Sequence, residues 1–141
     1  MNLNNINNGT FIWEEDVFKT IEECILNHTP IMVFVNMTSV QFTCKLISVV
    51  SQIKKDFDDL TSEEYDTLDR KINEICQAPL WLNDMIIKSI EDYKSAEEVI
   101  ANEKIKYVFI DSLPEAIDKT EIIKWSEEVG FNVYFTKLTK E

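Results

Sequence analysis

The 141-residue chain carries 26 acidic and 14 basic residues, which gives a net charge of −12 and an isoelectric point near 4.5. Contact with nucleic acid depends on clustered lysine and arginine, so this charge argues against a protein that binds nucleic acid on its own. No apolar run approaches the roughly 20 residues of a membrane span, and the polar N-terminus does not resemble a secretory signal. We therefore expect a cytoplasmic protein that does not associate with a membrane.

The first ten residues are polar and rich in asparagine, and we expect them to form a flexible lead-in to one domain that spans residues 11–141. A chain of this length can build one hydrophobic core but not two comfortable domains. Cys24, Cys44 and Cys76 are widely spaced within apolar helical patterns, which predicts buried, reduced thiols. With His28 as the single histidine, the sequence offers no metal-binding spacing, so we expect no metal site.

Helical and strand patterns alternate along the rest of the chain. Val17, Ile21 and Ile25 recur at helical spacing and predict a first helix, and Thr38 or Ser39 is expected to open the second. Runs rich in β-branched and aromatic residues predict strands at residues 31–36, 80–83, 106–111 and 132–136. Three of these runs are almost continuously apolar, as expected for strands covered on both faces. The alternation predicts an α/β domain with a mainly parallel sheet.

A helix is predicted to follow Leu60. Thr61 and Glu64 have the spacing of a capping box, in which each side chain bonds the backbone of the other residue. Apolar residues then recur at helical spacing and predict a buried stripe of Tyr65, Leu68, Ile72 and Ile75.

Two more helices are indicated near the C-terminal half of the chain. Ser89 with Asp92 predicts a helix start, and the apolar positions that follow run as far as Ile100. Asp118 predicts the start of the last helix, which we expect to end at Gly130 in the C-cap position.

Six short segments, taken in chain order, resemble motifs of one known family. They are residues 34–38 (FVNMT), 60–65 (LTSEEY), 78–84 (APLWLND), 89–92 (SIED), 108–115 (VFIDSLPE) and 136–140 (TKLTK). Together they resemble the RecA-like C-terminal motor domain of DnaB-type replicative helicases, with the fifth segment in the place of the Walker B strand. The resemblance implies a RecA-like, P-loop NTPase-like three-layer α/β fold with a mainly parallel sheet, truncated and lacking the P-loop.

The chain departs from this family at the positions that carry its chemistry. Neither of the two glycines precedes a lysine, so the phosphate-binding loop that ends in Gly-Lys-Ser/Thr is missing. The family's catalytic glutamate aligns with Asn36, whose amide cannot act as a general base near neutral pH. The Walker B aspartate is retained as Asp111, whereas Lys137 replaces the glutamine that senses the terminal phosphate in the family. The resemblance places the family's arginine finger and DNA-binding loops beyond Glu141.

The resemblance also implies a vestigial nucleotide-binding site at one edge of the sheet, formed by Asp111, Asn36 and Lys137, with Asp84 close by. Asp111 has two interpretations. It could keep a contact to Mg²⁺ or nucleotide, since open α/β sheets bind ligands beyond the carboxyl ends of their strands. Alternatively, it could be a structural carboxylate that caps a helix start or pairs with Lys137. We expect no catalytic residue and no bound cofactor.

Phe11 and Trp13 lie where a complete motor would carry its first strand and its P-loop. Exposed tryptophans often dominate protein interfaces, so we predict a protein contact at these two residues. The alternative is that they close the core of the domain itself. Trp81 falls within a predicted strand and is expected in the core.

These features lead to the hypothesis of a catalytically inactive, DnaB-helicase-like RecA domain that acts as a non-catalytic protein-interaction or regulatory module in DNA replication. Its partner would be a replicative helicase subunit or a second copy of the chain. An alternative is an ATP-binding DNA helicase fragment that hydrolyses Mg-ATP only with a partner chain that supplies the missing loop. A third possibility is a chain that folds but has no selected role.

Overall fold

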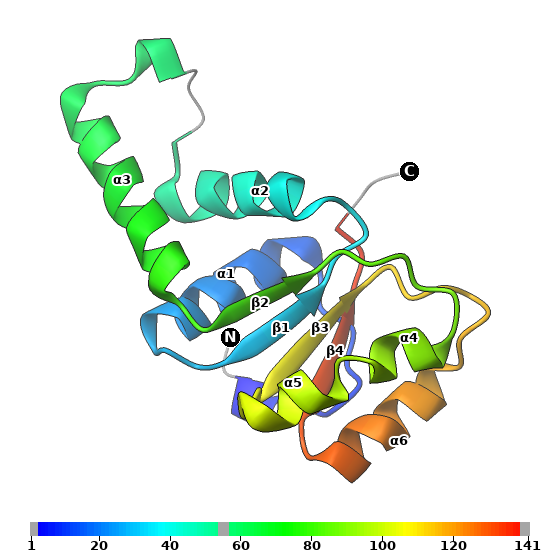
Figure 1. Cartoon of the computed structure of the whole chain (residues 1–141). Coiled ribbons are helices and arrows are strands. Elements are labelled where there is room, and N and C mark those ends of the chain that lie inside the picture. The colour runs from blue at the N-terminus through cyan, green and yellow to red at the C-terminus, as the bar shows by residue number, and fades with distance from the viewer. Residues whose placement is uncertain (1–2, 54–56, 139–141) are drawn as a thin grey trace.

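The computed structural model describes residues 3–53 and 57–138 and contains a parallel sheet between two layers of helices (Figure 1). The strands are β1 (Ile31–Phe34), β2 (Leu80–Asn83), β3 (Tyr107–Asp111) and β4 (Asn132–Thr136). Their spatial order is β2-β1-β3-β4, and every neighbouring pair is parallel. The predicted three-layer α/β fold with a parallel sheet is confirmed, and all four predicted strands are present.

Helices cover both faces of this sheet. They are α1 (Glu14–Leu26), α2 (Ser39–Ser51), α3 (Ser62–Gln77), α4 (Ile90–Lys94), α5 (Glu97–Asn102) and α6 (Lys119–Val129). The buried residues of α1 and α2 pack on one face, and those of α4, α5 and α6 pack on the other. None of the described helices combines the length and the apolar character that crossing a membrane requires.

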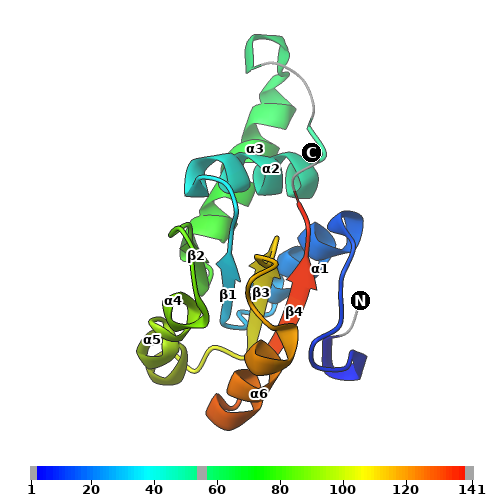
Figure 2. The same ribbon diagram turned by 90° about the vertical axis from the view of Figure 1, so that its right-hand side faces the viewer.

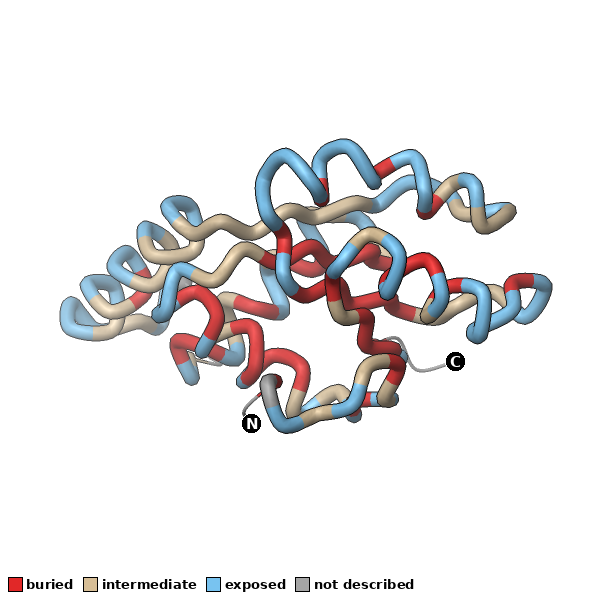
Figure 3. Tube along the Cα trace, turned by 90° about the horizontal axis from the view of Figure 1, so that it is seen from below, coloured by how far each residue is buried: buried red, intermediate tan, exposed pale blue. Residues whose placement is uncertain are grey.

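The central strands hold the two layers together. Successive side chains of a strand point to opposite faces, so a strand covered on both sides is apolar throughout. In β3, Phe109 packs beneath α1 and α2, Ile110 packs against the opposite layer, and both are fully buried. Burial of one such side chain contributes about 1.5–3 kcal/mol. The buried residues accordingly concentrate in the sheet and on the inner sides of the helices (Figure 3).

Two helices begin with reciprocal capping boxes. At α2, the Thr38 hydroxyl accepts from the Gln41 N–H at 3.1 Å, and the Gln41 side chain accepts from the Thr38 N–H at 3.0 Å. At α3, the predicted pair of Thr61 and Glu64 makes the same two bonds, each at 3.1 Å. Both boxes satisfy N–H groups that a helix start otherwise leaves unpaired.

The predicted buried stripe of α3 is wrong in its extent. Leu68 is buried, Ile72 and Ile75 are half-buried, and Tyr65 is 43% exposed. The helix packs on α2 and α1, but its N-terminal half rises away from the body of the molecule (Figures 1 and 2). The apolar periodicity therefore identified the helix correctly, whereas the length of its packed face depended on where α2 ends.

Two other expectations need correction. Cys24 is buried, and burial raises the pKa of its thiol to about 11, but Cys44 and Cys76 lie on outward faces and are exposed. The helix predicted from Ser89 to Ile100 is divided into α4 and α5. At the division, the Ser95 hydroxyl donates to the Asp92 carbonyl at 2.6 Å, a local bond that competes with regular helix geometry.

The N-terminal segment pairs with the outer edge of β4, a question that the sequence left open. Gly9 N–H donates to the Val133 carbonyl at 2.8 Å, and the Asn8 side chain accepts from the Val133 N–H at 2.7 Å. Further along, Phe135 exchanges bonds with Thr10 and Ile12, and Phe11 forms a parallel bridge to Phe135. Residues 8–12 therefore cover an edge of the sheet that would otherwise expose unpaired backbone groups.

Candidate functional site

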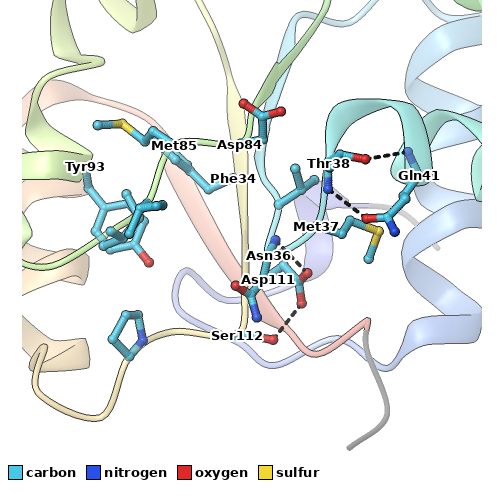
Figure 4. A pocket seen from close by; sticks show the side chains of 14 residues that line it. Phe34, Asn36, Met37, Thr38, Gln41, Asp84, Met85, Tyr93, Asp111 and Ser112 are labelled. Atoms are coloured by element: carbon cyan, nitrogen blue, oxygen red, sulfur yellow. Dashed lines mark hydrogen bonds between the residues drawn. The ribbon is translucent and has the colours of Figure 1, made fainter.

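A cleft of about 400 Å³ opens at the edge of the sheet where the carboxyl ends of β1 and β3 meet (Figure 4). The start of α2, the segment after β2 and part of α4 complete its walls. Open parallel sheets bind ligands at this edge, so it is the first place to examine for chemistry. Of the residues predicted from the sequence, Asn36, Asp84 and Asp111 line the cleft.

Asp111 is the buried carboxylate of the cleft. It is the last residue of β3 and is 4% exposed. Its Oδ1 accepts from the Leu138 N–H at 2.8 Å and from the Ser112 hydroxyl at 3.0 Å, and its Oδ2 accepts from the Asn36 N–H at 3.1 Å. These bonds tie together the chain just beyond β1, β3 and β4. A structural role for this carboxylate is therefore visible in the geometry.

The segment after β4 folds back over Asp111. Leu138 is 1% exposed and belongs to the core beneath α1 and α2, and its carbonyl accepts from the Lys45 Nζ at 3.3 Å. Lys137, one residue earlier, is exposed and lies outside the lining of the cleft. The predicted trio is thus brought together only in part, because Asn36 and Asp111 are bonded and Lys137 is set apart from the cleft.

Asp84 occupies the start of α2. Its Oδ2 accepts from the Ser39 backbone N–H at 3.1 Å and from the Ser39 hydroxyl at 3.0 Å. These hydrogen bonds hold the pKa of the Asp84 carboxyl below its usual value. The N-terminus of a helix attracts anions, and here a carboxylate of the same chain takes that place. Sequence reasoning missed the pair because its members lie 45 positions apart and share no local motif.

Tyr93 forms the apolar back of the cleft. Its ring packs edge-on against Phe34 with 5.0 Å between centroids, and it is 1% exposed. Burial and the neighbouring carboxylate of Asp111 raise the pKa of the Tyr93 hydroxyl well above its ordinary value. The phenol therefore stays protonated at neutral pH and does not offer a base.

The charge of the cleft is unsuited to phosphate. Its described lining residues include the carboxylates of Asp84 and Asp111 but no lysine and no arginine. Phosphate sites in proteins rely on Arg, Lys or converging N–H groups. In the part of the chain that the structure describes, no cluster of three His, Cys, Asp or Glu side chains is placed to hold a metal ion.

The start of α1 lies where a P-loop would join a strand to a helix. Phe11 forms the bridge to β4, and α1 begins at Glu14, so only Ile12 and Trp13 lie between them. Figure 2 shows the segment running beside β4 and turning directly into α1. The first turn of the helix contains Glu14, Glu15 and Asp16. No glycine-rich loop fits in this connection.

Phe11 and Trp13 are exposed at this junction, by 41% and 66% respectively. Their rings meet edge-on with centroids 5.0 Å apart. Ile12 between them is 2% exposed and closes the core beneath α1. The two aromatic side chains therefore remain available at the surface.

Comparison with known proteins finds structural relatives only. No family model and no curated protein matches the sequence. The structure resembles the ATPase domain of a DnaB-like helicase with a TM-score of 0.72 and 16% identity, covering 93% of this chain and 58% of that one. It also resembles a DnaB-like replicative helicase, from a structure that concerns its interactions with primase, with a TM-score of 0.64, 17% identity, and coverage of 92% and 40%.

The chain thus spans less than two thirds of the length of either structural neighbour. At these identities, the likeness establishes the fold and not the activity. The resemblance indicated by the six sequence motifs is confirmed at that level. This chain has the RecA-like fold of the ATPase domains of DnaB-like replicative helicases.

Proposed function

We propose that this chain is a non-catalytic relative of the DnaB-type motor domain, which acts as a protein-interaction or regulatory module in the cytoplasm. The observation that carries the proposal is the start of α1, where a strand bridge at Phe11 is followed by a helix at Glu14. A P-loop helicase would need a phosphate-binding loop between these elements.

Charge at this helix start opposes nucleotide binding. A phosphate group there would approach the carboxylates of Glu14, Glu15 and Asp16 in place of free N–H donors and a lysine. Two unit charges of the same sign at 4 Å repel by about 1 kcal/mol in water and about 4 kcal/mol near a protein surface. Several such terms act together against a triphosphate, which supports a domain that needs no nucleotide cofactor.

The positions that would perform hydrolysis also differ. Asn36 stands where the family has its general base, and an amide cannot take a proton from water near neutral pH. Asp111 is already bonded to three donors of its own chain. Since each tenfold in rate corresponds to about 1.4 kcal/mol of barrier, losing both the lysine and the base removes several kcal/mol of stabilisation.

A protein partner fits the surface and the charge. Phe11 and Trp13 offer an exposed aromatic contact, and the net charge of −12 disfavours nucleic acid as a direct ligand. One of the structural neighbours is a helicase whose structure concerns its interactions with primase. A replicative helicase subunit is therefore the first partner to test.

The nucleotide side of this proposal is tested by calorimetric titration of the purified chain with Mg·ATP and, separately, with Mg·ADP. We expect no binding heat at millimolar nucleotide. Stoichiometric binding of either nucleotide would contradict the proposal, and Asp111, Asn36 and Lys137 would then be the first residues to substitute.

The partner side is tested by size-exclusion chromatography of the chain mixed with the DnaB-type helicase of its own organism. We expect co-elution at micromolar concentrations, and clean separation would count against the proposed partner. The same mixture tests the alternative of a helicase fragment completed by another chain. That alternative requires ATP turnover beyond that of the helicase alone, and its loss in the Asp111→Ala variant.

A further inference from the structure

We propose that Phe11 and Trp13, together with the acidic first turn of α1, form a docking surface for a basic, arginine-bearing segment of a partner protein. This inference rests on the proposed interaction function and specifies the chemistry of the partner. We call this surface the α1 junction, and define it by Phe11, Trp13, Glu14, Glu15 and Asp16. It lies beside β4, at the N-terminal end of α1 (Figure 2).

Trp13 breaks two local rules without any visible gain for the fold. It occupies the N-cap of α1 with φ −72° and ψ 151°, a position that favours Ser, Thr, Asp or Asn, and its side chain makes no capping bond. The helices α2, α3 and α6 begin after Thr38, Thr61 and Asp118, whose side chains do cap. Trp13 is also 66% exposed. Breaches of local preference that bring no structural return are expected at functional sites.

The aromatic pair suits a cationic side chain. Phe11 and Trp13 meet edge-on at 5.0 Å, which fixes the two rings relative to each other before any partner binds. Tryptophan is the aromatic side chain that attracts Lys and Arg most strongly over its face, and it is enriched among the residues that dominate interfaces. A rigid pair of this kind loses little side-chain freedom on binding.

The carboxylates beside this pair select the charge of the partner. Glu14, Glu15 and Asp16 form no ion pair with another residue in the described part of the chain. At a helix N-terminus these acids interact favourably with the helix dipole, so the fold tolerates them at this end. Arginine can bond a carboxylate with two N–H groups and stack on an aromatic ring at the same time. The net charge of −12 attracts a basic segment and repels a second copy of the chain.

A groove of about 450 Å³ extends this surface between α1 and α2. Glu14 and Glu15 line its near end, and Phe18 and Val49 supply apolar surface, with Val49 41% exposed. Lys45 also lines the groove, but its Nζ is bonded to the Leu138 carbonyl. The partner segment should therefore carry an apolar side chain near its arginine, the arginine for the α1 junction and the apolar group for the groove.

The test uses the full chain, labelled with ¹⁵N, and a defined probe, a short amphipathic peptide of alternating arginine and leucine. A matched peptide of glutamate and leucine is the control. We expect the arginine peptide to shift the backbone signals of residues 11–19, the Trp13 indole N–H and Val49, and this effect to weaken as salt is raised. The buried indole of Trp125 should not respond.

Two sets of variants then locate the contact. Trp13→Ser should weaken binding of the arginine peptide about tenfold or more while raising the unfolding temperature, since serine is a preferred N-cap. A merely structural tryptophan would show the reverse. The pair Glu14→Gln and Glu15→Gln should also weaken binding, whereas Asp66→Asn with Asp69→Asn, exposed residues of α3 that remove the same charge, should not.

Several outcomes would overturn the inference. These are no response to the arginine peptide, shifts confined to the acidic N-terminal end of α3, equal loss of binding in both charge pairs, or full binding by Trp13→Ser. Failure here is distinct from failure of the proposed function. A chain that co-elutes with the helicase but binds elsewhere keeps the proposed function and loses this surface. A chain that binds Mg·ATP loses the proposed function, while the peptide map still reports on the α1 junction.

Discussion

The starts of α1 and α2 offer a direct comparison, because both helices begin at the carboxyl edge of the same sheet. At α2, Thr38 and Gln41 form a capping box and Asp84 accepts two bonds from Ser39, so the helix start is closed by the chain itself. At α1, the N-cap residue is Trp13, which makes no capping bond and is mostly exposed. One helix start is thus satisfied internally and the other is left available.

This contrast explains how a motor fold can persist without its nucleotide. In a P-loop protein, the phosphate satisfies the N–H groups at a helix start. Here, α2 uses an internal carboxylate for that purpose, and α1 carries its own acids in the first turn. Neither start depends on a ligand, so the fold can be stable in its absence. The variants below break or sharpen the contrast, from the largest expected effect to the smallest.

The largest effect is expected from Asp111→Ala, on the closed side of the comparison. The change leaves the N–H groups of Asn36 and Leu138 without their acceptor, and unpaired buried donors cost about 1–3 kcal/mol each. We expect the free energy of unfolding, measured by urea denaturation, to fall by about 2–4 kcal/mol. Ser112→Ala is the control, because it removes one donor and leaves both backbone bonds in place. An equal loss in the two variants would contradict this account.

On the open side, Asn8→Ala should loosen the segment that carries Phe11. The Asn8 side chain accepts from the Val133 N–H at 2.7 Å and donates to the Ser126 hydroxyl at 2.8 Å. Its loss should lower the free energy of unfolding by about 1–3 kcal/mol, because Val133 is buried. The exposed neighbour Asn7 is the control, and Asn7→Ala should change stability by less than about 0.5 kcal/mol.

Thr38→Ala makes the start of α2 resemble that of α1 by removing its cap. We expect a loss of about 1 kcal/mol in the free energy of unfolding, measured by thermal and urea denaturation. Thr43→Ala in the same helix is the matched control and should be close to neutral, because its hydroxyl bonds a carbonyl within the helix at Ser39. If both variants lose the same stability, the cap is not what closes this helix start.

The smallest effect is expected at Asp84, whose carboxylate is exposed, and it should depend on pH. Its bonds from Ser39 lower the pKa in the folded state below the ordinary value of 3.8. The stabilisation is therefore fully present above pH 3.8 and is lost as pH falls through the lower folded pKa. The stability gap between the natural chain and Asp84→Asn should accordingly hold at neutral pH and close in acid. Asp66→Asn controls for the general change in charge, and a gap independent of pH would refute the role of Asp84.

Much of the architecture was predictable from local signals. Runs of β-branched and aromatic residues located the four strands, because a strand buried on both faces must be apolar at every position. The spacing of Thr61 and Glu64 located the start of α3, since a capping box needs only two residues of the same turn. Asp111 was identified as the polar residue at the end of an apolar strand. Each of these signals is contained within a few neighbouring residues.

The tertiary structure alone decided which of these groups meet. Asp84 reaches Ser39 from 45 positions away, Asn8 reaches Val133 from 125 positions away, and Asp111 is covered by a backbone N–H of Leu138. A backbone group carries no mark in the sequence, and pairs so distant share no local pattern. For the same reason, periodicity could not tell how far α3 would remain packed. The sequence by itself determined the elements and their caps, whereas packing decided that α2 would be closed by its own chain and α1 left exposed.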